Sequence, residues 1–191
     1  GFGGTTYYVH ARRRALPPGA VAFCTIHDYA AMRLAGRTRP LCHLSDAASF
    51  GLFRLEEGAF DWKAIEQAGM DPALFPEVTA DFAVLGEYRG APVCAALGDN
   101  QASFLGSVSD MEDSALVNVG TGSQVSLAVD SPAFTADLEA RPLAAGRYLL
   151  VGSSLCGGRA YAILEGFFRQ VLEMAGSGGE RALYDSMEEA A

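Results

Sequence analysis

The spacing of hydrophobic residues along the chain changes several times between extended and helical periods. Short apolar or alternating runs predict strands. They cover residues 20–25, 82–88, 92–97, 115–119, 124–129 and 148–151. Several of these runs lead into segments with helical spacing, so the chain is expected to fold as an α/β protein.

Two short helices are indicated by their end signals. Thr25 followed by Asp28 resembles a capping box, and Gly36 can end the helix in the left-handed conformation. One face of this helix is apolar and consists of Ile26, Tyr29, Ala30 and Leu34. A second helix is expected to start after Asp61 and to end at Gly69.

The clearest helical pattern opens at Gly157 and Gly158 and keeps apolar residues at i, i+3 and i+4 for four turns. The apolar positions are Ala160, Ile163, Leu164, Phe167, Phe168, Val171, Leu172 and Ala175. Such a stripe predicts a helix that is buried against a core.

Two predicted turns contain residues that could take part in catalysis or ligand binding. Gly98, Asp99 and Asn100 form a sharp turn between a strand and a helical run over residues 101–108, which places a carboxylate at the mouth of a sheet. Residues 120–123, with the sequence GTGS, form the tip of a hairpin. Taken singly, Asp99 is better interpreted as a simple turn or N-cap residue, and the tip as an ordinary hairpin turn.

The composition limits the classes of molecule that the chain is expected to bind. Half of the residues are hydrophobic, 19% are charged and the net charge is -9, so the chain has material for a core and repels polyanions. No run approaches a membrane span of about 20 apolar residues. We therefore expect a cytoplasmic protein that binds neither nucleic acid nor membranes. The four cysteines are scattered, which favours reduced thiols over a zinc site, and no metal ligands are assigned.

Phosphoryl transfer to an alcohol needs a carboxylate for the hydroxyl proton, amides around the phosphates and a divalent metal. The turn at Asp99 could supply the carboxylate, and the tip around Thr121 could supply the amides. In addition, residues 97–106 (LGDNQASFLG) and 118–124 (NVGTGSQ) resemble two motifs of the FGGY carbohydrate kinases, which have the actin-like ATPase (ribonuclease H-like) fold. Residues 25–36 and 45–53 are similar to further segments of that family.

The resemblance implies ATP and Mg²⁺ as cofactors and a sugar as substrate, with a ketose such as sedoheptulose favoured. It assigns Asp99 as the general base and Asn100 as a sugar contact. The residues implied for ATP binding are Gly120, Thr121, Gly122, Ser123 and Gly158. For Gly158, a close contact between helix and sheet is an equally good interpretation.

The resemblance also implies how the chain is organised. Residues 1–110 would be the end of an N-terminal, sugar-binding domain, and residues 111–191 the start of a C-terminal, nucleotide-binding domain. The family's Asp-x-Gly-Thr hairpin would precede residue 1 and its adenosine segment would follow residue 191. The chain is thus expected to be an internal fragment with little kinase activity alone. It departs from the family at Thr6 and Val9, where lysine and tryptophan are usual.

Other polar residues receive structural interpretations. Asp46 could bind sugar, but a role in capping its own loop is favoured. His27 and Asp28 are interpreted as helix-start residues, and His10 and His43 as structural.

Two competing functions remain: an actin-like nucleotide-binding or regulatory protein without kinase activity, and an unrelated hydrolase or metal enzyme that uses Asp99 with a histidine. The latter requires a histidine near Asp99, whereas all three histidines precede residue 44.

Overall fold

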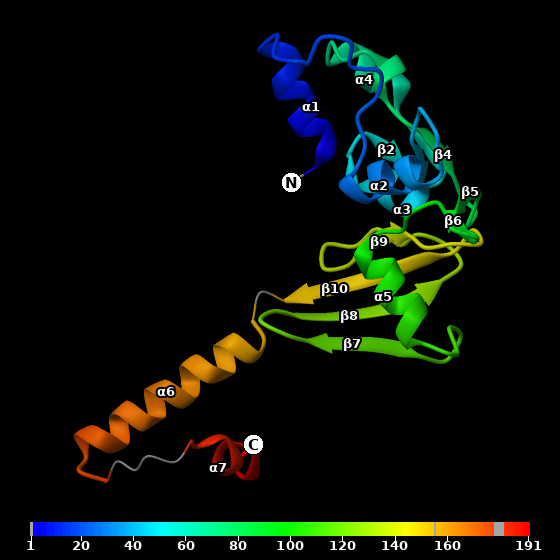
Figure 1. Ribbon diagram of the computed structural model, residues 1–191. Helices are drawn as coiled ribbons and strands as arrows, with labels where there is room; N and C mark the ends of the chain where they lie inside the picture. The colour runs from blue at the N-terminus through cyan, green and yellow to red at the C-terminus, as the bar shows by residue number, and fades with distance from the viewer. Residues whose placement is uncertain (1, 155, 178–181) are drawn as a thin grey trace.

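The computed structural model describes residues 2–154, 156–177 and 182–191. Its first half consists of short helices and paired strands (Figure 1). The helical elements are α1 (Gly3–Arg12), α2 (Ile26–Leu34), α3 (Leu44–Ser49), α4 (Trp62–Gln67) and the 3-10 turn η1 (Pro72–Leu74). The strand pairs are parallel β1 (Leu41–His43) with β4 (Glu77–Thr79), and antiparallel β2 (Phe53–Arg54) with β3 (Ala59–Phe60) and β5 (Val84–Tyr88) with β6 (Ala91–Cys94).

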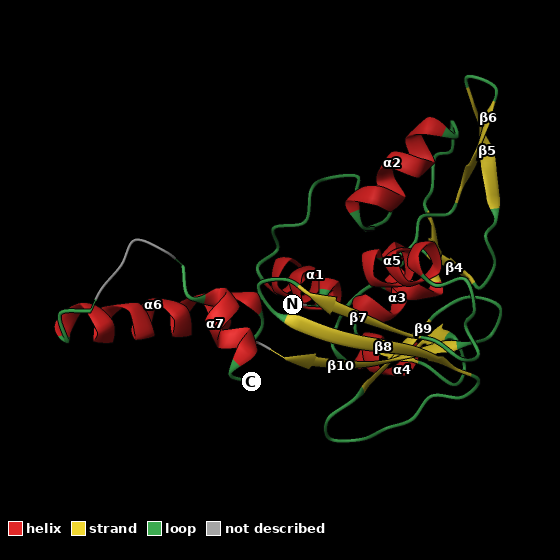
Figure 2. Ribbon diagram, turned by 90° about the horizontal axis from the view of Figure 1, so that it is seen from below, coloured by secondary structure: helices red, strands yellow, loops and turns green. Residues whose placement is uncertain are grey.

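The second half is built on an antiparallel sheet in the order β7-β8-β10-β9. Its strands are β7 (Ala115–Val119), β8 (Ser123–Val129), β9 (Glu139–Pro142) and β10 (Tyr148–Ser154). Helix α5 (Asp99–Ser107) precedes the sheet, and α6 (Gly158–Met174) and α7 (Tyr184–Glu189) follow it. Figure 2 shows the β5–β6 hairpin and α6 projecting away from the sheet in different directions.

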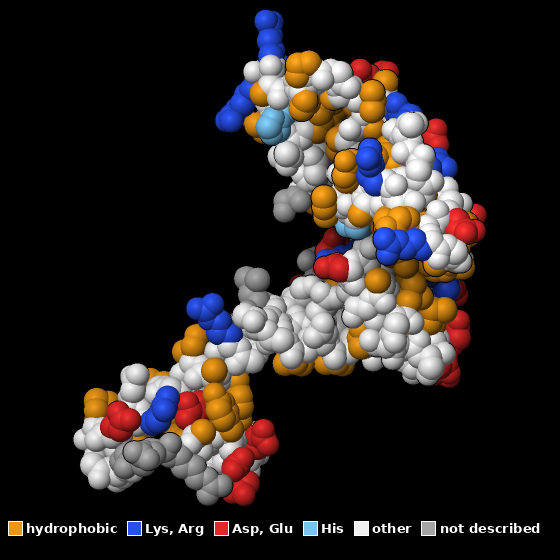
Figure 3. Space-filling view, viewed as in Figure 1, with side chains coloured by type: hydrophobic (Ala, Val, Ile, Leu, Met, Phe, Trp, Pro, Cys, Tyr) orange, Lys and Arg blue, Asp and Glu red, His pale blue; other side chains and the backbone are white. Residues whose placement is uncertain are grey.

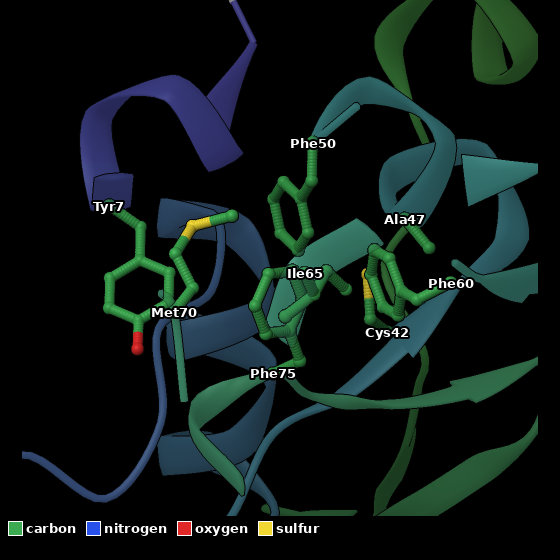
Figure 4. Packing of buried hydrophobic residues seen from close by; sticks show 8 residues of the cluster. All are labelled: Tyr7, Cys42, Ala47, Phe50, Phe60, Ile65, Met70 and Phe75. Carbon is green, nitrogen blue, oxygen red and sulfur yellow. The ribbon is translucent and has the colours of Figure 1, made fainter. Parts of the chain in front are cut away.

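Aromatic side chains form the core of the first half (Figure 4). Phe75 packs edge-on against Phe60, with ring centroids 4.9 Å apart, and Phe50 lies parallel to Phe60 at 6.1 Å. Ile65 of α4 is fully buried among these rings. Edge-to-face and offset pairs of this kind add to the hydrophobic stabilisation of large apolar side chains. The core fixes the position of α3, which carries part of the functional site.

Helix α5 packs on the sheet. Phe104 of α5 is fully buried in one cluster with Leu143, Leu149 and Val151. The helix that starts at Asp99 is therefore anchored in the core of the second half. The two halves also touch through Tyr148 of β10, whose hydroxyl donates to the carbonyl of Leu55 at 3.1 Å.

The end signals of α2 are confirmed, but its predicted apolar face is not the buried one. Thr25 and Asp28 form the capping box, and Gly36 has φ +69°. The buried residues are instead Asp28, Ala31 and Met32. The predicted positions Ile26, Tyr29 and Leu34 are exposed. Their periodicity identified the helix correctly but not the side that faces the protein.

Two further local predictions were wrong. Residues 20–25 form no strand; this segment runs past η1, where the amide of Phe23 donates a single backbone hydrogen bond to Leu74. In addition, Asp46, which was interpreted as capping its own loop, lies in helix α3, whose N-cap is His43. By contrast, the second helix starts after Asp61 as expected, since the Asp61 carboxylate accepts a hydrogen bond from the amide of Ala64.

Helix α6 has the expected bounds, but the prediction that its apolar stripe is buried is wrong for this structure. Phe167 is 57% exposed, and Glu165 is the buried residue of the helix. Hydrophobic side chains line its surface in Figure 3. Helix α7 lies along part of α6, with the rings of Tyr161 and Tyr184 5.7 Å apart. In the part of the chain that the structure describes, no helix has both the length and the apolar character needed to cross a membrane.

Candidate functional site

A cleft of about 960 Å³ lies where the first half meets the sheet. Its walls come from the starts of α2, α3 and α5 and from β9. The polar and charged side chains that line it are Thr25, His27, Ser45, Asp46, Ser49, Asp99, Asn100, Gln101, Glu139 and Arg141. Figure 3 shows histidine and acidic side chains at this junction.

Asp99 is the first residue of α5 and is exposed to the cleft. Its Oδ1 accepts a hydrogen bond from the amide of Asn100 at 2.6 Å. The amides at a helix start interact favourably with a negatively charged group. Asn100 lines the same cleft, and its Oδ1 accepts a hydrogen bond from Arg141 of β9 at 3.2 Å. The structure therefore brings both predicted sugar-side residues together.

The turn before Asp99 is fixed by buried polar groups. The amide of Gly98 donates to Ser45 Oγ at 2.9 Å, and this hydroxyl lies 2.9 Å from His43 Nδ1. His43 is fully buried, and burial lowers the pKa of its imidazole. A neutral ring can donate from Nε2 to the carbonyl of Ala80 and accept at Nδ1. His43 thus has a structural role, as expected; through Ser45 it links α3 to the turn before Asp99.

The contacts of Asp46 differ from those expected from the sequence. Its carboxylate makes no hydrogen bond within its own loop; Oδ1 lies 2.9 Å from His27 Nε2 of α2 instead. The other oxygen, Oδ2, is buried and has no hydrogen-bond partner among the described residues. Burial, with the nearby charges of Asp28 and Asp99, raises the pKa of Asp46 to about 6, while His27 acts to lower it.

The same region contains a set of side chains that could hold a cation. One ligand atom each from His27, Asp28 and Asp46 lie within 4.8 Å of one another. Oδ1 of Asp28 is also buried without a hydrogen-bond partner. Imidazole and carboxylate ligands suit a divalent metal. However, His27 and Asp46 already bind each other, and Asp28 closes the capping box of α2.

The predicted phosphate-side residues form a second, separate group. The hairpin tip at residues 120–123 joins β7 to β8, and its glycines lie against the start of α6. A Cβ on Gly157 would lie 2.6 Å from the backbone carbon of Gly122, and a Cβ on Gly122 would lie 3.0 Å from the carbonyl oxygen of Ser154. Glycine is therefore required where these backbones meet.

Gly158 belongs to this group, but its amide is already used. It donates a 2.8 Å hydrogen bond to the carbonyl of Gly120. This bond supports the close-contact interpretation of Gly158, because the amide is not free to bind an anion. Gly120, Thr121 and Gly122 are exposed at the tip. None of this second group lines the cleft that contains Asp99.

Sequence reasoning missed the partners that complete the cleft. Glu139 and Arg141 of β9 were not singled out, and His27 was interpreted as a helix-start residue. Arg141 binds Glu139 at 2.7 Å and also reaches Asn100. The histidine that a hydrolase hypothesis requires near Asp99 does line the cleft, but His27 is bound to Asp46 rather than to Asp99.

Comparison with known proteins gives the relationships of the chain. No family model matches it. It is 32% identical over 153 residues to human sedoheptulokinase, a match that covers 72% of this chain and 32% of the relative. It is 31% identical over 110 residues to glycerol kinase from Trichlorobacter lovleyi, covering 54% of this chain and 22% of that protein. The chain thus spans about a third or less of the length of these relatives.

Solved structures share its fold. Gluconate kinase from Lactobacillus acidophilus matches with a TM-score of 0.75 and 19% identity over 98% of this chain and 39% of its own. Glycerol kinase from Plasmodium falciparum, solved with ADP, matches with a TM-score of 0.62 and 17% identity over 73% of this chain and 31% of its own. The expected actin-like ATPase fold is confirmed by these matches, in the part that the chain represents.

Proposed function

From the confirmed resemblance of this chain to the FGGY carbohydrate kinases, we propose that the protein transfers the γ-phosphoryl group of ATP to a hydroxyl group of a sugar. The favoured substrate is a ketose such as sedoheptulose, because human sedoheptulokinase is 32% identical over 72% of the chain. The activity belongs to a full-length kinase that includes this segment, since the chain represents about a third of that relative.

The observation that supports the proposal best is the position of Asp99 in a cleft rich in carboxylates. Asp46, Asp99 and Glu139 all line it, and the cationic Arg141 is paired with Glu139. Such a surface repels phosphate groups and offers hydrogen-bond acceptors to hydroxyl groups. The cleft therefore suits a neutral polyol chain better than a nucleotide phosphate.

In this proposal Asp99 orients the reacting hydroxyl and accepts its proton as the oxygen attacks the γ-phosphorus. The amide of Asn100 donates a hydrogen bond to the Asp99 carboxylate and holds it at the start of α5. Asn100 contacts a second hydroxyl group through its side-chain amide, while Arg141 holds its Oδ1. Together these contacts fix which hydroxyl of the sugar meets the phosphate.

We assign the nucleotide side to the hairpin tip. Gly120, Thr121, Gly122 and Ser123 would approach the phosphates with backbone amides and hydroxyls, as glycine allows close contact. Gly158 would contribute by leaving space rather than by donating its amide, which binds Gly120. The structural match to a glycerol kinase that was solved with ADP supports nucleotide binding by a protein of this fold.

Mg²⁺ is expected to bind mainly through the phosphates of ATP with one or two carboxylates. Within the described residues, the cluster of three candidate ligands is His27, Asp28 and Asp46, which adjoins the sugar-side cleft. The cluster lies on the sugar side and not beside the proposed phosphate-binding residues, so it does not fit an ion that is bound to the phosphates of ATP. We therefore assign no Mg²⁺ ligand and no step of the reaction to these side chains.

We propose that residues 1–110 and 111–191 lie in the two domains between which the substrates bind. Helix α5 then connects them, because Asp99 at its start faces the cleft while Phe104 is anchored in the sheet core. Closure of the domains would bring the tip toward Asp99 and exclude water from the transferred group.

The test is ADP release by the full-length kinase with a panel of ketoses and polyols. We expect release that depends on one or a few sugars, with a ketose among the best substrates. Release that no sugar or polyol stimulates would contradict the proposal and favour a nucleotide-binding protein without kinase activity.

A further inference from the structure

We propose that His27 is a sugar-binding residue of the cleft and that Asp46 is the positioning residue that orients its ring. This inference rests on the proposed kinase function and adds a specificity-determining contact to it. Such a ring would recognise a hydroxyl group of the polyol chain other than the one that is phosphorylated.

The imidazole of His27 is suitably placed for a ligand. His27 lies in the first turn of α2, whose start is fixed by the capping box between Thr25 and Asp28. Its side chain is 44% exposed and lines the same cleft as Asp99 and Asn100. Since α2 and α5 reach the cleft separately, a sugar that meets Asp99 can contact His27 with another part of its chain.

The ring has one nitrogen in use and one free. Nε2 lies 2.9 Å from Oδ1 of Asp46, and the Asp46 side chain is only 4% exposed. Among the described residues, no partner binds Nδ1. When Asp46 is ionised it can only accept, so Nε2 carries the hydrogen and Nδ1 of the neutral ring is an acceptor. A sugar hydroxyl is the natural donor for that nitrogen.

Asp46 is buried beside the cleft, and its one polar side-chain contact among the described residues is with His27. A carboxylate taken out of water costs free energy, and this one leaves Oδ2 without a hydrogen bond. Residues kept in such an unfavourable setting are often those that orient a functional group. Asp28 and Asp99 lie near Asp46 and repel its charge, so His27 is its favourable partner.

The test uses the full-length kinase and compares the best sugar with its deoxy analogues, each lacking one hydroxyl group. His27→Phe keeps a flat ring but removes both nitrogens. We expect the KM for the sugar to rise about tenfold, as for the loss of a hydrogen bond worth about 1.4 kcal/mol, with the KM for ATP unchanged. The analogue that lacks the contacted hydroxyl should be unaffected by the substitution.

Two further variants make the result decisive. Asp46→Asn should raise the sugar KM with the same dependence on the analogues, whereas His10→Phe, outside the cleft, should leave all constants unchanged. If His27→Phe changes the KM of every analogue equally, or leaves the sugar KM within about twofold, the inference is wrong. An inactive wild-type enzyme would instead contradict the proposed function itself.

Discussion

The amide of Gly158 donates a 2.8 Å hydrogen bond to the carbonyl of Gly120, which ties the start of α6 to the tip of the β7–β8 hairpin. The two backbones approach so closely that Gly157, the residue before, has no room for a side chain. This junction belongs to the proposed nucleotide side.

Substitution of Gly157 by alanine is expected to destabilise the chain. The added Cβ would lie 2.6 Å from the carbon of Gly122 and 2.8 Å from the oxygen of Gly120, and backbone atoms cannot easily move aside. We expect the free energy of unfolding to fall by about 1–3 kcal/mol, as measured by urea denaturation of this chain. Gly166→Ala in the same helix is the control: its Cβ meets open space, so it should stabilise α6 by up to about 1 kcal/mol. Equal effects would contradict the packing described.

The capping box of α2 gives a second prediction. Thr25 Oγ1 accepts a hydrogen bond from the Asp28 amide at 3.1 Å and donates to the Asp28 carboxylate at 2.7 Å. Thr25→Ala removes both and should lower the free energy of unfolding by about 1 kcal/mol. Thr25→Ser keeps the hydroxyl and should lie close to wild type in the same denaturation experiment. A serine variant as unstable as the alanine variant would show that the hydroxyl is not what matters.

Asp46 makes stability depend on pH. Its pKa rises from 3.8 to about 6 on folding, so the folded chain binds more protons than the unfolded chain between these values. The free energy of unfolding should therefore decrease as pH rises from about 4 to 6, by up to about 3 kcal/mol from this group. The groups that face it are His27, Asp28 and Asp99.

The measurement for Asp46 is the difference between wild type and Asp46→Asn in unfolding free energy across that pH range. The asparagine variant should gain stability relative to wild type as pH rises. Asp61→Asn, which keeps an N-cap side chain on α4 outside the cleft, should follow the wild-type curve. A constant difference between wild type and Asp46→Asn would show that the carboxylate is not strained by burial.

Local signals predicted much of the fold because they act over a few residues. The capping box at Thr25 and the N-cap at Asp61 both lie where the pattern placed them. The parallel β1–β4 pair was not predicted, since each strand has three residues and the partners lie 36 positions apart. Residues 20–25 are apolar enough for a strand, but they form none; Phe23 donates one backbone hydrogen bond to Leu74.

Burial was harder to predict than secondary structure. The stripe of α6 has the spacing of a core helix, yet Phe167 lies 57% exposed, because spacing shows that a face is apolar and not what covers it. In the cleft, the motif around Asp99 could be found from the chain alone. The pair of His27 and Asp46 could not, because the two residues are 19 positions apart and lie on two different helices, α2 and α3.

The central claim is that Asp99 is the general base for the sugar hydroxyl, and Asp99→Asn in the full-length kinase tests it most directly. The variant keeps the size of the side chain but cannot accept the proton. We predict that turnover falls by about 10² to 10⁴-fold while the affinity for ATP, measured separately by equilibrium binding, stays within about twofold. Asp110→Asn, an exposed carboxylate outside the cleft, should retain wild-type turnover. Near-normal turnover of Asp99→Asn would contradict the account.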